Sequence, residues 1–329
     1  MTWNLIGHSW AEVLLKEHIL HGEVRHAYLF VGAPGVGRRS LALEFACAVN
    51  CLQPPALGEF CGQCRMCTQI LKLKQPDLAI VQPEGDGQII KVDQVRALQH
   101  SLSLSPYEAK YRVALLLNFQ LANANAQNAL LKTLEEAPRQ VILLLTADSA
   151  ENLLPTIASR CEILRLRPVA VETLTDALQT RWSLSAEKAS LYAHLANGRT
   201  GTAIQFSSDP ALLDRRTALL DDFVKLLHQP RRDRFAYVDM LSKNRDSTRI
   251  ALQTWFTYVR DLLLLTNQVI GKVTNLDRET ELKGIAAELN PAEALQLVKA
   301  IDTALANLEV NGHLRLLLDT LFLDLPRIQ

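Results

Sequence analysis

The feature that most constrains the fold of this chain is a glycine-rich segment at residues 32–40, which reads GAPGVGRRS. The apolar run at 28–31 before it is typical of a strand, and the run at 41–46 after it favours a helix. A strand, a glycine loop and a helix in this order are typical of a phosphate-binding loop in an α/β domain. The sequence therefore predicts such a loop, with the Walker A spacing, built on Gly32, Gly35 and Gly37.

The residues that give such a loop its chemistry are missing. An active loop continues with a lysine that holds the β and γ phosphates and a Ser or Thr that ligates Mg²⁺. Arg38 and Arg39 stand at these positions, and the planar fork of an arginine does not reproduce the point charge of a lysine. Ser40 lies one residue further on, about 100° round the helix. We expect a degenerate loop, and the sequence leaves open whether Gly32, Gly35, Gly37 and Arg38 still hold a nucleotide.

A second element of an ATPase is also altered. The run at 112–118 is strand-like and sits where the acidic Walker B strand would be, but it ends in Leu117 and Asn118. Leucine offers no metal ligand, and asparagine cannot act as a base toward the attacking water. This pattern favours a plain buried strand.

Four closely spaced cysteines indicate a metal site. Cys61, Cys64 and Cys67 follow one another at CxxC spacing, and Cys51 lies before them across a loop rich in Pro and Gly. Four thiolates suit tetrahedral Zn²⁺, and a disulfide is the weaker interpretation in a reducing compartment. Cys47 is an alternative fourth ligand, although it falls within an apolar run; we predict Cys51. The expected site is closed and structural, with no open position for water.

Length and charge limit the remaining possibilities. A chain of 329 residues is long for one domain, and 35 basic residues balance 35 acidic ones. A net charge near zero argues against a protein that holds DNA alone by bulk electrostatics. The first residues lack the pattern of a signal peptide, and no uncharged apolar run is long enough to cross a membrane. We therefore expect a cytoplasmic protein.

The pattern of elements divides the chain into three parts. Strand-like and helical runs alternate up to about residue 167, which predicts an α/β doubly wound domain. Helical patterns fill the rest, with a linker at 207–210. The predicted domains are 1–167, which includes the zinc insertion at about 51–67, a small helical domain at 168–207, and an all-helical domain at 208–329.

Two further motifs resemble a known family. The helical run at 128–136, NALLKTLEE, and the tripeptide Ser159-Arg160-Cys161 resemble the bacterial clamp loader branch of the AAA+ family. The loop, the cysteines, the helix and the tripeptide occur in that family's order. The resemblance, which covers roughly residues 1–205 well, implies an AAA+ domain, a helical lid and an all-helical collar. Gly201 occupies the position where motor subunits have a sensor arginine.

The resemblance also implies a role. The departures at Arg38, Arg39, Leu117 and Asn118 match the non-hydrolysing subunit type of the loader. Arg160, flanked by Ser159 and Cys161, is then expected to act in trans as an arginine finger on the ATP of a neighbouring motor subunit. The implied partners are the τ/γ motor subunits and the δ subunit in a hetero-pentamer, with the sliding clamp and primer-template DNA reached through the complex. An active motor subunit is the alternative; a free-standing zinc-dependent nucleic-acid binder is disfavoured by the neutral charge.

Overall fold

A computed structural model describes residues 3–84, 89–269, 273–309 and 313–326 of the chain. The chain forms two compact units, one made of Met1–Ala177 with Gly198–Thr202 and the other of Leu178–Asn197 with Ala203–Gln329. The first unit contains the glycine loop, the cysteines and Arg160, so it holds all predicted site residues. The separate boundaries for a lid at 168–207 and a collar at 208–329 stay a prediction.

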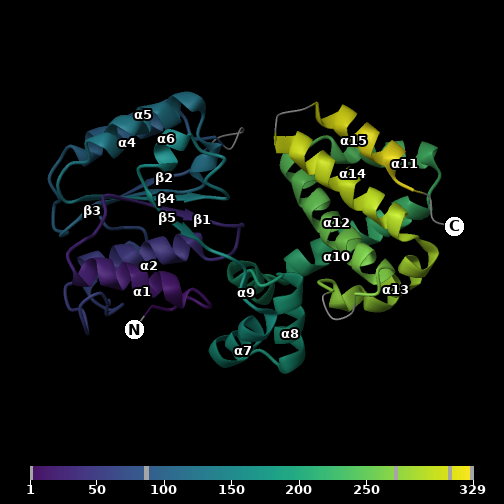
Figure 1. Ribbon diagram of the computed structural model, residues 1–329, viewed down its shortest axis with the longest axis horizontal. Helices are drawn as coiled ribbons and strands as arrows, with labels where there is room; N and C mark the ends of the chain where they lie inside the picture. The colour runs from purple at the N-terminus through teal and green to yellow at the C-terminus, as the bar shows by residue number, and fades with distance from the viewer. Residues whose placement is uncertain (1–2, 85–88, 270–272, 310–312, 327–329) are drawn as a thin grey trace. The chain divides into compact units, whose positions relative to one another are not determined.

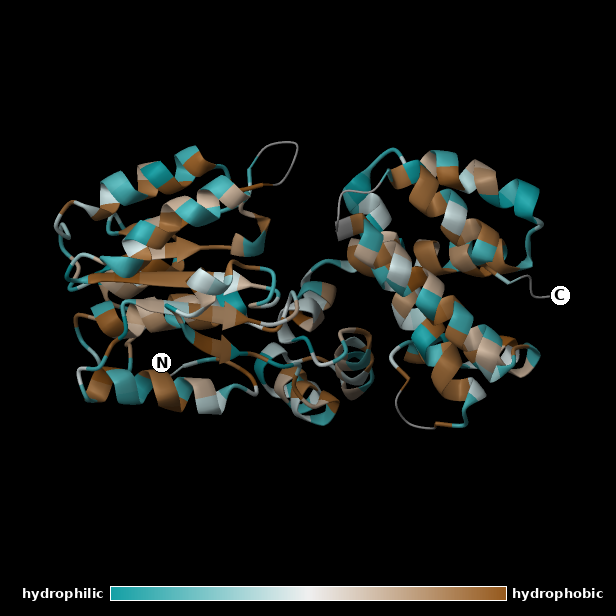
Figure 2. Cartoon of the chain, turned by 45° about the horizontal axis from the view of Figure 1, so that its top comes forward, coloured by the Kyte–Doolittle hydropathy of each residue, from teal (hydrophilic) through white to brown (hydrophobic). Residues whose placement is uncertain are grey.

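The first unit is built on a parallel sheet (Figure 1). The sheet has five strands in the order β2-β3-β4-β1-β5. Most strand residues are buried because helices cover both faces, which is why these runs are almost continuously apolar (Figure 2). The predicted parallel α/β domain followed by helices is confirmed. The strands are β1 (Ala27–Val31), β2 (Leu78–Val81), β3 (Arg112–Leu116), β4 (Val141–Ala147) and β5 (Glu162–Arg165).

Successive strand residues face opposite sides of the sheet and join two different cores. Tyr28 and Phe30 of β1 pack in a core with the first three helices, whereas Leu29 and Val31 pack in a core with the next three. Figure 1 shows these two helical layers on the two faces of the sheet. Their helices are α1 (Ser9–Leu20), α2 (Arg38–Asn50), α3 (Arg65–Leu71), α4 (Val92–Leu102), α5 (Ala124–Glu135) and α6 (Pro155–Ala158), with the 3₁₀ turn η1 (Phe119–Leu121).

The strand order brings three loops to one edge of the sheet. β4 lies between β3 and β1, and all three run in the same direction, with Leu116 opposite Leu145 and Val31 opposite Ala147. The carboxyl ends of the three strands therefore meet, and ligands of open α/β sheets bind at such an edge. The glycine loop follows β1 here, and the residues after β3 and β4 face it.

The second unit is helical, and α7 (Val171–Trp182) and α9 (Thr200–Ser208) run across the boundaries between the units. Its largest buried side chains include Phe223, Trp255, Tyr258 and Phe322, whose rings pack on one another. None of the helices in the described part of the chain is both long and apolar enough to cross a bilayer. The further helices are α8 (Ala186–Leu195), α10 (Pro210–His228), α11 (Arg231–Leu241), α12 (Arg245–Thr266), α13 (Glu279–Glu288), α14 (Pro291–Glu309) and α15 (Leu314–Asp324), with the 3₁₀ turn η2 (Leu276–Arg278).

Candidate functional sites: the glycine loop, the cysteine cluster and the Arg160 turn

The backbone of the glycine loop adopts conformations that only glycine takes up easily. Gly32 has φ +151°, and a Cβ there would lie 2.3 Å from the carbonyl oxygen of Leu166. Gly37 has φ +107° and is the N-cap of α2, a left-handed conformation that side chains rarely adopt. The loop thus keeps a conformation that depends on glycine, although its catalytic side chains are replaced.

The start of α9 covers part of this loop. The backbone N–H of Gly201 donates a hydrogen bond to the carbonyl oxygen of Gly35 over 2.7 Å. A Cβ at Gly35 would lie 2.3 Å from Oγ1 of Thr202, and a Cβ at Gly201 would lie 3.0 Å from the oxygen of Gly35. The position at which motor subunits are expected to carry a sensor arginine is therefore in close backbone contact with the loop, and a Cβ there would require a shift of a few tenths of an ångström.

Arg38 is turned toward the ends of the neighbouring strands. Its side chain is only 8% exposed, and Nη1 donates to Oδ1 of Asp148 over 2.6 Å. Nη2 donates to Oδ1 of Asn118 over 3.4 Å. Asp148 follows β4 and Asn118 follows β3, so the guanidinium spans the edge of the sheet. Its charge is balanced by a carboxylate of the same chain, at the position where an active loop presents its lysine to phosphates.

The other altered positions offer no carboxylate to a magnesium ion. Arg39 and Ser40 are exposed on the first turn of α2, and Leu117 is buried in the core. Asn118 has a left-handed backbone with φ +51°, and its N–H donates to Oγ1 of Thr146. At the two Walker B positions the chain thus presents an apolar side chain and an amide already bonded to Arg38.

The four predicted cysteines lie together. The Sγ atoms of Cys51, Cys61, Cys64 and Cys67 all lie within 4.8 Å of one another, and those of Cys51 and Cys61 are 3.6 Å apart. A tetrahedral zinc with Zn–S bonds of about 2.3 Å needs sulfur separations of about 3.8 Å. The cluster therefore fits a metal such as zinc with only small adjustments, and four sulfur ligands leave no open coordination position.

Backbone N–H groups point at the sulfurs of this cluster. The N–H of Cys61 donates to Sγ of Cys51 over 3.3 Å, that of Cys64 to Sγ of Cys61 over 3.2 Å, and that of Cys67 to Sγ of Cys64 over 3.5 Å. Hydrogen bonds from the backbone of Gln63 and Cys64 lower the pKa of Cys61 to about 6. Such donors stabilise thiolates, the form in which cysteine binds a metal.

Cys47 lies outside the cluster of four sulfurs. It is fully buried in the core of the α/β unit, and its thiol donates to the carbonyl oxygen of Cys67 over 3.8 Å. Burial raises the pKa of Cys47 to about 12. The sequence left Cys47 and Cys51 as alternatives for the fourth ligand, and the structure groups Cys51 with the other three.

The tripeptide at 159–161 forms the turn that follows α6. Nη1 of Arg160 donates to the carbonyl oxygen of Thr156 over 2.9 Å, and Nη2 donates to Oε1 of Glu135 over 2.7 Å. The Arg160 side chain is 34% exposed. Ser159 donates through its hydroxyl to the same Thr156 carbonyl, and burial raises the pKa of the Cys161 thiol to about 12. Arg160 thus lies at the surface in a defined position.

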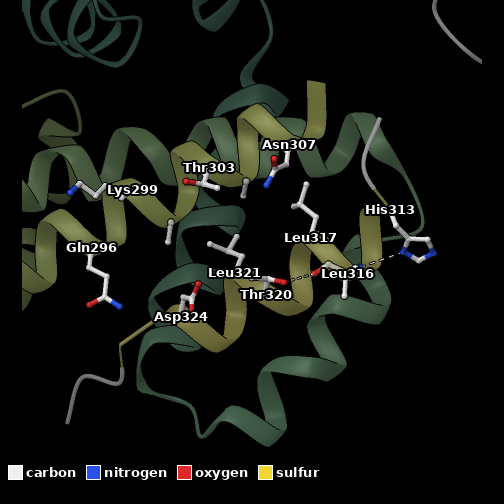
Figure 3. Close-up of a pocket in the computed structure, with 12 residues that line it drawn as sticks. Gln296, Lys299, Thr303, Asn307, His313, Leu316, Leu317, Thr320, Leu321 and Asp324 are labelled. Carbon is white, nitrogen blue, oxygen red and sulfur yellow. Dashed lines mark hydrogen bonds between the residues drawn. The ribbon is translucent and has the colours of Figure 1, made fainter. Parts of the chain in front are cut away.

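The second unit contains a hollow that no sequence motif predicted. It has a volume of about 670 Å³ and lies between α14 and α15. Figure 3 shows polar side chains such as Lys299, Thr303 and Asn307 on one side and Leu317 and Leu321 on the other. Its mixed lining brings together no group of metal ligands and none of the predicted site residues.

Together, the parallel sheet, the glycine loop, the cysteine cluster after α2 and the Ser-Arg-Cys turn define an AAA+ protein of the clamp loader class. The family described as "DNA polymerase III, delta subunit" matches residues 7–170. The chain belongs to the DNA polymerase III δ′ family of clamp loader subunits.

Three relatives illustrate the similarity. The chain is 28% identical to DNA polymerase III subunit δ′ of Bacillus subtilis, over 96% of this chain and 98% of that protein. It is 37% identical to the δ′ subunit of Pseudomonas aeruginosa over 47% of each chain. It is 31% identical to the τ subunit of Escherichia coli over 54% of this chain and 29% of that protein. The chain thus spans nearly all of one relative and less than half the length of the other two.

Proposed function

We propose that this clamp loader δ′ subunit hydrolyses no ATP itself and supplies Arg160 to the ATP site of a neighbouring motor subunit. The proposal rests on one contrast above all. Arg38 is tied to Asp148 and Asn118 at the chain's own glycine loop, whereas Arg160 stays partly exposed on a surface turn. A guanidinium that enters a neighbour's site offsets the charge that develops on the transferred phosphoryl group.

The proposed partners are the τ/γ motor subunits and the δ subunit, in a hetero-pentamer that loads the sliding clamp onto primed DNA in the cytoplasm. The 31% identity to a τ subunit over 54% of this chain supports an assembly in which related subunits lie side by side. We assign residues 168–207 to a lid and 208–329 to the collar through which the subunits assemble. Co-elution of the chain with τ/γ and δ in size-exclusion chromatography tests the assembly.

The test of the catalytic role is Arg160→Ala in the assembled loader. The expected loss is about 10³-fold at the one ATP site that faces this subunit. Total turnover falls less, because the other sites of the assembly continue to work. DNA-stimulated ATPase and clamp loading are the two measurements. Equal clamp loading by both assemblies would contradict the proposal.

Arg165→Ala is the matched control. Arg165 is also an exposed arginine of the α/β unit, and it pairs with Glu151 over 3.4 Å. Loss of a surface ion pair alone changes stability little, so this variant should load clamps normally. A similar loss in both variants would point to a general effect of surface charge.

An active motor is the alternative function, and the purified chain tests it. We expect no ATP turnover above a heat-inactivated sample, because the lysine and the acidic residues are absent from their positions. Turnover that Asn118→Ala abolishes would favour the motor.

We propose that Cys51, Cys61, Cys64 and Cys67 hold one structural zinc ion. Metal analysis should give about one zinc per chain, and Cys64→Ser should lose the metal and destabilise the α/β unit. Cys47→Ser should keep it, since the sulfur of Cys47 is not one of the four that cluster. Full zinc in Cys51→Ser with loss in Cys47→Ser would show that Cys47 is the ligand.

A further inference from the structure

The helix α5 contacts both ends of the segment that carries Arg160. Near its start, the buried Gln127 donates through Nε2 to the carbonyl oxygen of Ala122. Through Oε1 it accepts the N–H of Leu154, the residue just before α6, over 2.9 Å. At the other end of α5, Glu135 contacts Arg160 beyond the end of α6. The position of Arg160 is therefore linked to one helix at two points.

The guanidinium of Arg160 is held on two of its nitrogens by two different elements. Nη2 donates to the Glu135 carboxylate of α5 over 2.7 Å, and Nη1 donates to the Thr156 carbonyl of α6 over 2.9 Å. A guanidinium carries further N–H groups, which remain for another acceptor. The two contacts therefore fix the plane of the Arg160 guanidinium and leave it further N–H groups that can donate.

We propose that Glu135 is a positioning residue for Arg160, an inference that rests on the proposed function of Arg160 in trans. A partly exposed arginine otherwise samples many rotamers, and ordering it at the moment of reaction opposes catalysis. Glu135 orders the side chain before the neighbour's phosphate arrives. The Glu135 side chain is 51% exposed, so solvent screens the pair, and a phosphate group can compete with it.

The experiment is a double-mutant cycle with Glu135→Ala and Arg160→Ala in the assembled loader. Glu135→Ala should remove most of the ATP turnover that Arg160→Ala removes, which corresponds to about a tenfold loss at the site concerned. The KM for ATP should stay unchanged, because the neighbouring subunit binds the nucleotide. Glu135→Gln keeps an acceptor oxygen and should recover part of the loss. In the Arg160→Ala background, Glu135→Ala should have no further effect.

Glu151→Ala is the matched control, since it removes an exposed carboxylate that pairs with Arg165 in the same unit. It should leave turnover unchanged in both backgrounds. Size-exclusion chromatography of each assembly checks that the variants still incorporate.

The outcomes separate the two proposals. If Arg160→Ala lowers turnover but Glu135→Ala changes nothing, raises turnover, or lowers it equally in both backgrounds, the positioning role of Glu135 is wrong and the role of Arg160 stands. If Arg160→Ala itself has no effect, the proposed function fails, and the inference about Glu135 fails with it.

Discussion

Two arginines of the α/β unit make similar contacts in different surroundings. Arg38 donates to the carboxylate of Asp148 and to an amide oxygen, and Arg160 donates to the carboxylate of Glu135 and to a backbone carbonyl. The two ion pairs have nearly equal lengths, 2.6 and 2.7 Å. They differ in burial, because the Arg38 side chain is 8% exposed and that of Arg160 is 34% exposed.

Burial decides what each pair can do. A buried cation depends on its partner, because the protein interior solvates a lone charge poorly. An exposed pair contributes little free energy and can exchange one acceptor for another. Arg38 is therefore committed to its partners within the chain, whereas the proposed role of Arg160 requires a pair that can exchange its acceptor. The same residue type is therefore nearly buried at one site and partly exposed at the other.

Among the variants that test this comparison, we expect Arg160→Lys to have the largest effect, a loss of ATP turnover in the assembled loader. An ammonium lacks the forked donors of a guanidinium, so it cannot keep both the Glu135 contact and a bidentate contact to phosphate. We expect a loss of at least about 100-fold at the facing ATP site. Near-normal clamp loading by this variant would show that a simple positive charge is sufficient.

A smaller effect, this time on stability, is expected for Asp148→Ala. It leaves the nearly buried Arg38 without its carboxylate, and an unpaired buried charge typically costs about 3 kcal/mol or more. Urea unfolding of the purified chain measures the change. A change below about 1 kcal/mol, as expected for Glu135→Ala at the exposed pair, would remove the distinction between the two arginines.

Arg38→Met should destabilise the chain less than Asp148→Ala does. The carboxylate left behind is 40% exposed and can be hydrated, so the expected loss is about 1–2 kcal/mol from the charged hydrogen bonds. Clamp loading by the assembled variant should be unchanged. If Arg38→Met is the more damaging of the two, then the Arg38 pair contributes mainly through packing of the arginine stem.

The smallest effect is expected from ATP itself. A nucleotide at 100 times its Kd would stabilise the folded chain by about 2.7 kcal/mol, which is a clear shift in Tm. We expect millimolar ATP to shift the Tm by less than about 1 °C, because Arg38 is engaged with Asp148 and Asn118. A motor subunit in the same assay is the positive control. A shift of several degrees would show that the loop still binds nucleotide.

Local sequence patterns predicted the elements of the α/β unit but not the partners of its arginines. The glycine loop and the cysteine spacing are local features, and both are found where the sequence placed them. The helix after the loop begins at Arg38, with Gly37 as its N-cap, and includes the apolar run at 41–46 that favours a helix.

The missed residues depend on topology. Asp148 lies 110 residues from Arg38 along the chain, and it reaches Arg38 only because β4 pairs with β1. Glu135 lies 25 residues from Arg160 and meets it because α5 and α6 pack on the same face of the sheet. No periodicity in the sequence gives the order of strands in a sheet, so these pairings could not be read from local patterns.

The contact between Gly201 and Gly35 has a consequence for anyone who wishes to express the α/β unit alone. A fragment that stops at residue 167 or 177 lacks the N–H that Gly201 donates to the loop, and the carbonyl of Gly35 loses its donor. A fragment that keeps this hydrogen bond has to extend to residue 202, or has to join residue 177 to residue 198 through a short linker. Nucleotide binding by a shorter fragment would be measured on a loop that lacks this hydrogen bond.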